Sequence, residues 1–241
     1  MSESSRSAKT VLVTGAAKRI GRGIAIGLHQ AGYRVAIHYG GSEKEARGTA
    51  EHCGNAEIFQ ANLESVDEIR RMFRDVEQRL GALYGLVNNA ARFQLADPFT
   101  LTEKDWDFIH SVNLKATFFC AQQGALLMRK SGEGRIVNIS SLGGIRPWAD
   151  HAHYCASKAG VIMLTRALAK GFAPKITVNS VAPGVILSSD EEPRTQDLIQ
   201  ATPARRRGTV EEIADAVLYF LNATNFVTGQ TLAVDGGLSQ R

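Results

Sequence analysis

Residues 10–23 read TVLVTGAAKRIGRG, and this stretch decides the fold class. Its first five residues are β-prone and mostly apolar, and they predict a short strand that ends at Gly15. Beyond the turn, Ile20, Ile24 and Leu28 recur every four residues, the spacing of one buried helix face. A strand that passes through a glycine turn into a helix is the opening unit of a doubly wound α/β fold.

The alternation of strand and helix patterns continues along the chain. β-prone runs occupy residues 10–14, 34–39, 57–60, 83–88, 135–140, 176–181 and 231–234. Helical patterns occupy residues 65–80, 102–130, 153–170 and 210–221, and another helix is expected after Ser42, a predicted N-cap. Ser65 and Glu68 have the spacing of a capping box. Strands separated by helices pair in parallel through right-handed crossovers, so one doubly wound sheet is expected.

The length of 241 residues suits one domain. We expect residues 1–9 to form a flexible tail and residues 10–241 to form the single domain. Residues 187–207, which contain Pro193 and Pro203, interrupt the alternation. An irregular loop is expected there, of the kind that often lies over an active site.

The composition excludes several classes of protein. With 44% hydrophobic and 22% charged residues, the chain is neither disordered nor fibrous. No apolar run approaches the ~20 residues of a membrane span, and the first residues lack the apolar core of a secretory signal. The three cysteines have no CxxC spacing, which fits a reducing cytosol. We therefore expect a cytoplasmic protein that does not bind membranes.

The net charge of +4 leaves two kinds of partner open, a nucleic acid or a small anionic ligand. The run Arg205, Arg206 and Arg207 precedes a predicted helix without interleaved aromatic residues, so we interpret it as a solvated turn. No His, Cys, Asp or Glu cluster has metal-ligand spacing, so no catalytic metal is expected.

The glycine turn has the context that a dinucleotide requires. Small residues let the backbone approach a pyrophosphate, and a helix N-terminus supplies free N–H groups with a positive partial charge. An NAD site places a carboxylate after the second strand, whereas this chain has none there before Glu43. Lys18, Arg19 and the Ser42 hydroxyl would instead favour a 2′-phosphate, so NADP is expected rather than NAD.

A tyrosine and a lysine are the candidate catalytic pair. Tyr154 and Lys158 are four residues apart on one face of a predicted helix. A neighbouring ammonium favours the phenolate, so Lys158 is expected to lower the pKa of Tyr154. Ser141 ends the fifth strand, at the sheet edge where α/β proteins bind ligands.

These motifs together resemble those of the short-chain dehydrogenase/reductase superfamily over nearly the whole chain. The resemblance rests on TGAAKRIGRG (residues 14–23), NNA (88–90), Asn113, Ser141, YCASK (154–158), NSVAPG (179–184), VTGQ (227–230) and VDGG (234–237). It implies a single-domain Rossmann-type α/β fold with a seven-stranded parallel sheet flanked by helices. It also implies a homotetramer.

The resemblance further implies roles for individual residues. Tyr154 would donate the proton, Lys158 would adjust its pKa and clamp the ribose, Ser141 would position the substrate oxygen, and Asn113 would hold a proton-relay water. The glycine turn and the resemblance together predict the following cofactor-binding residues: Gly15, Lys18, Arg19, Ile20, Gly21, His38, Ser42, Asn62, Leu63, Asn89, Ala90, Tyr154, Lys158, Pro183, Gly184 and Ile186. Asn62 stands where the superfamily usually has Asp.

Within the superfamily, the chain looks most similar to pteridine reductases. Arg19 replaces the usual glycine as it does in those enzymes, and Phe93 lies four residues after Asn89. The resemblance implies that Arg19 contacts the cofactor phosphate and that Phe93 stacks on the pterin. Two features depart from that pattern: Gly40 and Gly41 replace an extra basic residue, and Ser141 stands where many pteridine reductases have Asp.

The residues beside the tyrosine have simpler interpretations. His151 and His153 lack a carboxylate partner in the sequence and are interpreted as solvated, and Cys155 as a small packing residue. The leading hypothesis is therefore NADPH-dependent reduction of a pterin, from a dihydropterin or dihydrofolate to the tetrahydro form, with Phe93, Ser141 and Tyr154 in the substrate site. The alternative is a carbonyl reductase of the same fold acting on 3-oxoacyl thioesters, which Ser141 supports. Both hypotheses explain the positive charge of the chain by the binding of a small anionic cofactor, NADPH, and neither requires a nucleic acid.

Overall fold

A parallel β-sheet forms the centre of the computed structural model, which describes residues 9–186 and 195–240. Over these residues the sheet has seven strands in the order β3-β2-β1-β4-β5-β6-β7, and every neighbouring pair is parallel. The strands are β1 Thr10–Val13, β2 Arg34–Tyr39, β3 Glu57–Gln60, β4 Gly85–Asn88, β5 Gly134–Ile139, β6 Ile176–Pro183 and β7 Thr231–Val234. The predicted fold class is confirmed.

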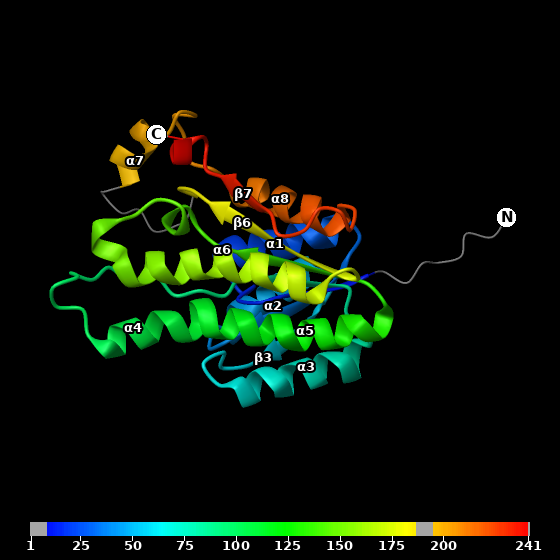
Figure 1. Ribbon diagram of the computed structural model, residues 1–241. Helices are drawn as coiled ribbons and strands as arrows, with labels where there is room; N and C mark the ends of the chain where they lie inside the picture. Colours follow the sequence, from blue (N-terminus) through cyan, green and yellow to red (C-terminus); the bar gives the residue numbers. More distant parts are fainter. Residues whose placement is uncertain (1–8, 187–194, 241) are drawn as a thin grey trace.

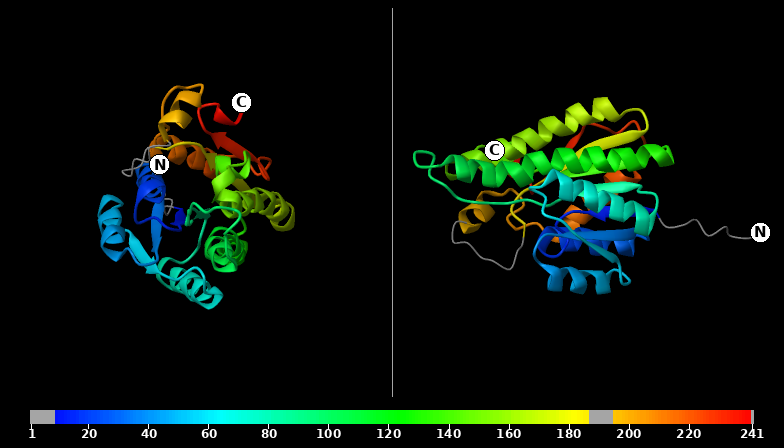
Figure 2. Two further views of the ribbon diagram at one scale, coloured as in Figure 1. Left: turned by 90° about the vertical axis from the view of Figure 1, so that its left-hand side faces the viewer. Right: turned by 90° about the horizontal axis from the view of Figure 1, so that it is seen from below.

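Helices cover both faces of the sheet (Figures 1 and 2). One face carries α1 (Arg19–Gln30), α2 (Glu43–His52) and α8 (Val210–Asn222). The other carries α3 (Val66–Leu80), α5 (Thr117–Ser131) and α6 (Ala152–Phe172). The shorter helices α4 (Glu103–His110) and α7 (Thr195–Ala201) extend beyond the edge of the sheet where the site lies (Figure 1).

The continuous apolar run of β1 follows from burial on both faces. Leu12 packs into the cluster beneath α3 and α5, whereas Val11 and Val13 pack into the cluster beneath α1 and α8. All three side chains are fully buried. A strand covered by helices on both sides has no polar face, so its sequence does not alternate.

Helices α1 and α8 approach each other closely because α1 carries glycines where they meet. A Cβ on Gly23 would lie 2.7 Å from the Cβ of Val210, and one on Gly27 would lie 2.9 Å from the Cβ of Ala214. Contacts this short do not occur between real side chains, so α8 can lie where it does only because these two positions lack side chains.

The predicted helix at residues 102–130 is present with a local change of geometry. It comprises α4, a π-helical turn at Ser111–Ala116, and α5. Thr102 begins α4 with a full capping box, which sequence analysis did not single out. In contrast, only half of the predicted Ser65–Glu68 box forms, because the Glu68 carboxylate accepts a hydrogen bond from the Asn62 N–H instead.

Two predictions concern segments at the margins of the described chain. The expected irregular segment at 187–207 is partly wrong, because residues 195–201 form α7. Residues 187–194 and the first eight residues of the predicted tail lie outside the described residues.

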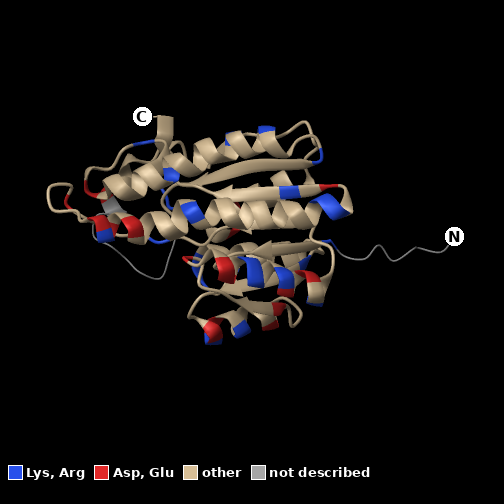
Figure 3. Ribbon diagram, turned by 60° about the horizontal axis from the view of Figure 1, so that its bottom comes forward, with Lys and Arg blue, Asp and Glu red and all other residues tan. Residues whose placement is uncertain are grey.

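Within the described chain, no helix is both long and apolar enough to cross a bilayer. Basic and acidic residues are interspersed along the helices and loops in the view of Figure 3.

Candidate active site

The turn between β1 and α1 is shaped by two glycines. Gly15 has φ +63°, in the left-handed region, and a Cβ placed on it would lie 2.9 Å from the Cα of Ala90. A Cβ on Gly21 would overlap the carbonyl oxygen of Gly15 and the side-chain amide of Asn89. That amide donates 2.9 Å to the carbonyl oxygen of Thr14. The turn therefore meets the end of β4 directly because neither glycine carries a side chain.

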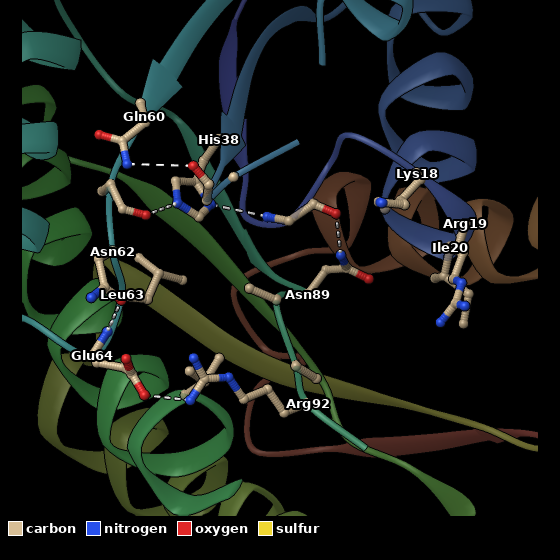
Figure 4. Close-up of a pocket in the computed structure, with 18 of the residues that line it drawn as sticks. Lys18, Arg19, Ile20, His38, Gln60, Asn62, Leu63, Glu64, Asn89 and Arg92 are labelled. Carbon is tan, nitrogen blue, oxygen red and sulfur yellow. Dashed lines mark hydrogen bonds and ion pairs between the residues drawn. The ribbon is translucent and has the colours of Figure 1, made fainter. Parts of the chain in front are cut away.

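A cavity of about 830 Å³ opens beside this turn (Figure 4). Its size is in the range of cofactor and small-molecule sites. Many residues predicted to bind cofactor or substrate line it: Gly15, Lys18, Arg19, Ile20, Gly21, His38, Asn62, Leu63, Asn89, Ala90 and Phe93. The cavity also has lining residues that sequence analysis missed: Gly40, Gly41, Gln60, Ala61, Glu64, Ala91, Arg92 and Val112.

Six predicted cofactor residues do not line this cavity: Tyr154 and Lys158, whose positions are given below, and the four described here. Ser42 occupies the N-cap position of α2 as predicted, but its side chain makes no capping hydrogen bond. Pro183 ends β6, and the N–H of Gly184 bonds to the carbonyl oxygen of Val234. Ile186 forms an isolated bridge beyond β6. None of these four lines the cavity described above.

The imidazole of His38 is buried and lies between the glycine turn and β3. Its Nδ1 accepts a 3.0 Å hydrogen bond from the Gly15 N–H, and its Nε2 lies 3.1 Å from the carbonyl oxygen of Ala61 (Figure 4). This arrangement requires the neutral tautomer with the proton on Nε2. Burial lowers the pKa of His38 to about 4, which keeps it neutral. Both ring nitrogens are thus engaged by the protein.

The cavity end near α1 suits a phosphate. Arg19 has φ +54° and lines the cavity at the start of α1, whose first turn carries no acidic residue. Lys18 also lies here, although its ammonium is paired 3.4 Å from Glu45 on α2. Gly40 and Gly41, which also line the cavity, leave open space where side chains would project. The basic residues, the helix N-terminus and the glycines fit a phosphorylated dinucleotide.

Tyr154, Lys158 and Ser141 converge at the carboxyl end of β5. The ammonium of Lys158 donates 2.9 Å to the carbonyl oxygen of Ile139, the last residue of that strand. Its Nζ lies 5.9 Å from the ring centroid of Tyr154. Ser141 follows β5 and accepts a 3.0 Å hydrogen bond from the N–H of Gly143. These three of the four predicted catalytic side chains are buried.

The electrostatics of this group differ from the expectation. Burial raises the pKa of Tyr154 to about 12, while a hydrogen bond with Ser141 opposes the rise. Burial also lowers the pKa of Lys158 to about 8. The predicted lowering of the tyrosine pKa by Lys158 is not seen, because removal from water dominates and the opposing contribution comes from the Ser141 hydrogen bond.

Asn113 lies in the π turn, and its side chain is fully engaged. Its Oδ1 accepts a 2.7 Å hydrogen bond from the N–H of Arg92. Its two amide hydrogens reach the carbonyl oxygen of Arg92, at 3.0 Å, and the hydroxyl of Ser157, at 3.1 Å. Ser157 in turn donates 2.7 Å to the carbonyl oxygen of Tyr154. The asparagine side chain therefore joins the segment after β4 to helix α6.

Phe93 belongs to a ring of four aromatic side chains. It meets Tyr154 edge to face, with centroids 4.8 Å apart, and it stacks on His151 at 4.7 Å. Trp148 closes the ring by contacting both His151 and Tyr154. Because Phe93 also lines the cavity, it joins the cavity to the tyrosine.

Of the two histidines beside Tyr154, His153 was predicted to be solvated, and this prediction is wrong. His153 is fully buried, and within the described chain neither ring nitrogen has a hydrogen-bond partner. Burial, followed by the nearby His110, lowers its pKa, while the carboxylate of Asp105 on α4 opposes this effect. Over residues 9–186 and 195–240, no group of three His, Cys, Asp or Glu side chains is arranged to hold a metal ion.

Comparison with known proteins adds a family and several relatives. A family model described as Enoyl-(Acyl carrier protein) reductase matches residues 15–239. A 3-oxoacyl-[acyl-carrier-protein] reductase of Staphylococcus aureus is 37% identical over 241 residues, covering 95% of this chain and 98% of that protein. The 3-oxoacyl-[acyl-carrier-protein] reductase of Synechocystis is 34% identical, covering 96% of this chain and 97% of that protein.

A solved structure extends the likeness to the whole fold. The gluconate 5-dehydrogenase of Burkholderia cenocepacia, solved in complex with NADP and tartrate, superposes with a TM-score of 0.90 and 32% identity. The match covers 97% of this chain and 96% of that one.

Proposed function

Because the chain belongs to the short-chain dehydrogenase/reductase superfamily of NAD(P)-dependent oxidoreductases, we propose that it reduces a 3-oxoacyl thioester to a 3-hydroxyacyl thioester with NADPH. The observation that carries the proposal is the buried group of Ser141, Tyr154 and Lys158 at the end of β5. The comparisons favour this carbonyl-reductase alternative over pterin reduction, since the curated relatives described above are 3-oxoacyl reductases.

The proposed chemistry requires a proton donor beside the reacting carbonyl. NADPH supplies the hydride when it is bound. Tyr154, protonated at neutral pH with its pKa near 12, donates the proton to the carbonyl oxygen. The Ser141 hydroxyl holds that oxygen, and the Lys158 ammonium stabilises the charge left on the tyrosine.

Asn113 acts in this proposal as a brace. Its amide hydrogens are already donated to Arg92 and Ser157, so the side chain holds the segment after β4 against α6. The predicted role of holding a proton-relay water remains a prediction.

The proposed cofactor preference for NADPH rests on charge. Arg19 and Lys18 stand at the start of α1, and no carboxylate follows β2 before Glu43. A 2′-phosphate would meet positive charge there instead of the acid that binds a free ribose hydroxyl. Ser42, Pro183, Gly184 and Ile186 lie outside the cavity lining, so their contacts with the cofactor remain predictions.

A turnover screen tests the proposal. NADPH oxidation would be followed with an acetoacetyl thioester of acyl carrier protein or coenzyme A, and in parallel with dihydrobiopterin, dihydrofolate and biopterin. Turnover of the thioester that disappears in Tyr154→Phe supports the proposal. A wild-type protein that reduces no thioester overturns it.

Pterin reduction stays the second candidate, because Phe93 stands against the tyrosine and lines the cavity. A planar ring could stack on its half-exposed face. Turnover of a dihydropterin in the same screen, lost in Phe93→Ala, would select this candidate. Ser141→Asp is then expected to improve reduction of oxidised pterin and to abolish thioester reduction.

The homotetramer implied by the resemblance is also a proposal. Sedimentation equilibrium of the full chain would test it.

A further inference from the structure

The side chains of Arg92 and Glu64 both line the cavity beside the glycine turn and face each other there. They form an ion pair between the segment after β4 and the segment after β3 (Figure 4). The guanidinium also donates 3.1 Å to the carbonyl oxygen of Phe108 and lies 4.2 Å over its ring. The hydroxyl of Ser111 reaches the same Glu64 carboxylate at 3.4 Å. Arg92 therefore joins three segments that are distant in the sequence.

The backbone of Arg92 is held as firmly as its side chain. Both its N–H and its carbonyl oxygen bond to the side chain of Asn113. From Asn113, hydrogen bonds continue through Ser157 to the carbonyl oxygen of Tyr154. One continuous set of contacts thus runs from Glu64 to the first turn of α6, which carries the tyrosine.

The next residue provides a second route to the same side chain. Phe93 follows Arg92 directly and meets the ring of Tyr154 edge to face at 4.8 Å. A shift of the Arg92 peptide would therefore move both the brace beneath Tyr154 and the ring beside it.

From this geometry we propose that Arg92 and Glu64 form a positioning pair that sets the placement of Tyr154 for proton transfer. The pair acts through the peptide of Arg92 and makes no direct contact with the reacting atoms. A partly exposed ion pair of this kind contributes on the order of 1 kcal/mol to stability, so a purely structural role would leave turnover nearly unchanged. A small displacement of a proton donor, in contrast, lowers the rate steeply.

The test compares Arg92→Met, Glu64→Gln and the double variant in the full chain, with Arg92→Lys as the conservative variant. We expect each single change to lower kcat by about tenfold. The KM for NADPH should stay within about threefold of the wild-type value, because cofactor contacts remain. The double variant should be no slower than either single variant. Arg92→Lys should recover most of the rate.

A second ion pair supplies the control. Arg47 and Glu43 on α2 are paired at 2.5 Å and exposed. Arg47→Met and Glu43→Gln are expected to leave kcat unchanged. A fall in melting temperature of the Arg92 and Glu64 variants without loss of kcat would overturn the proposal in favour of a structural pair. A raised KM for NADPH with unchanged kcat would overturn it in favour of a cofactor contact.

The kinetic readout rests on the function proposed above, but a second measurement does not. Hydrogen–deuterium exchange of residues 90–95 and 152–158 should rise in Arg92→Met and not in Arg47→Met. Unchanged exchange in both variants would overturn the positioning role. A wild-type protein without thioester turnover, but with the expected exchange pattern, would remove the proposed substrate and leave the positioning pair in place.

Discussion

The imidazole of His38 accepts a hydrogen bond of 3.0 Å from the backbone N–H of Gly15. The other ring nitrogen faces the carbonyl oxygen of Ala61 at 3.1 Å. A strand residue thus fixes the position of the glycine turn, and its predicted contact with the cofactor remains a prediction. Since a protonated ring could not accept the Gly15 N–H, the arrangement depends on a neutral histidine.

We predict that the free energy of unfolding decreases as the pH is lowered, because His38 is buried in its neutral form. The pKa of His38 is about 4 in the folded protein, below its ordinary value of 6.5. The unfolded chain therefore binds more protons between these values, and stability is lost as the pH falls from 6.5 towards 4. The loss reaches at most about 3 kcal/mol. Urea unfolding at several pH values should show a smaller loss for His38→Asn, whereas His52→Gln, at an exposed site, should follow the wild type. Parallel curves for His38→Asn and the wild type would contradict the prediction.

Replacing Arg19 with glycine should raise the stability of the fold and at the same time weaken its preference for NADPH. The left-handed backbone at φ +54° costs roughly 1 kcal/mol for a residue with a side chain, so Arg19→Gly should stabilise the fold by about that amount. The same change removes the proposed phosphate contact, so the KM for NADPH should rise about tenfold while that for NADH stays constant. Arg205→Gly, at φ +56°, is the control that relieves the same strain without affecting the cofactor. Equal effects on the two cofactors would refute the phosphate assignment.

The ionisation of Lys158 should limit activity at alkaline pH. Its pKa is about 8, whereas Tyr154 keeps its proton until about pH 12. The rate of reduction should therefore decline above pH 8 through loss of the ammonium, with the proton donor still intact. The measurement is the pH profile of kcat/KM in the reductive direction. A profile that is flat up to pH 10 would count against a role for this lysine charge.

Lys158 should also destabilise the fold that contains it. The pKa of Lys158 falls from 10.5 to about 8 on folding. This shift corresponds to roughly 3 kcal/mol at neutral pH, which is an upper bound on the free-energy cost of burying the ammonium. Lys158→Met is expected to raise the free energy of unfolding by about 1 kcal/mol or more, because the unpaired Ile139 carbonyl offsets part of the gain. Activity should be lost. Chemical denaturation at pH 7 measures the change, and a less stable variant would disprove it.

Two glycine-to-alanine changes should have opposite signs. At Gly23 an added Cβ would lie 2.7 Å from Val210, so Gly23→Ala should destabilise by about 1–3 kcal/mol. At Gly48, in the middle of α2, nothing lies within 4 Å of the added Cβ. Gly48→Ala should therefore stabilise by about 0.5–1 kcal/mol through helix propensity. Thermal unfolding of the pair tests the close approach of α1 and α8.

Local patterns predicted the seven strands, the helices other than α7 and most of the residues of the candidate site. The apolar run at β1, the turn at Gly15 and the pair of Tyr154 and Lys158 depend on residues that are near each other in sequence. Strand periodicity also located the end of β5 and hence Ser141.

The contacts between distant segments could not be predicted in the same way. Glu64 and Arg92 are 28 residues apart, and no local spacing marks an ion pair between two loops. The balance of charge and burial at Tyr154 was also inaccessible, because it depends on how completely the folded chain excludes water from the ring.

The π turn at Ser111–Ala116 has a consequence for how this segment can change over time. One turn holds an additional residue, and the widened turn absorbs it, so deletion of that residue would restore a regular helical turn and leave α4 and α5 near their present relative orientation. The local backbone at Asn113 would change, and with it the hydrogen bonds of this side chain to Arg92 and Ser157. A single-residue deletion between α4 and α5 would therefore test the position of Asn113 without changing the course of the two helices.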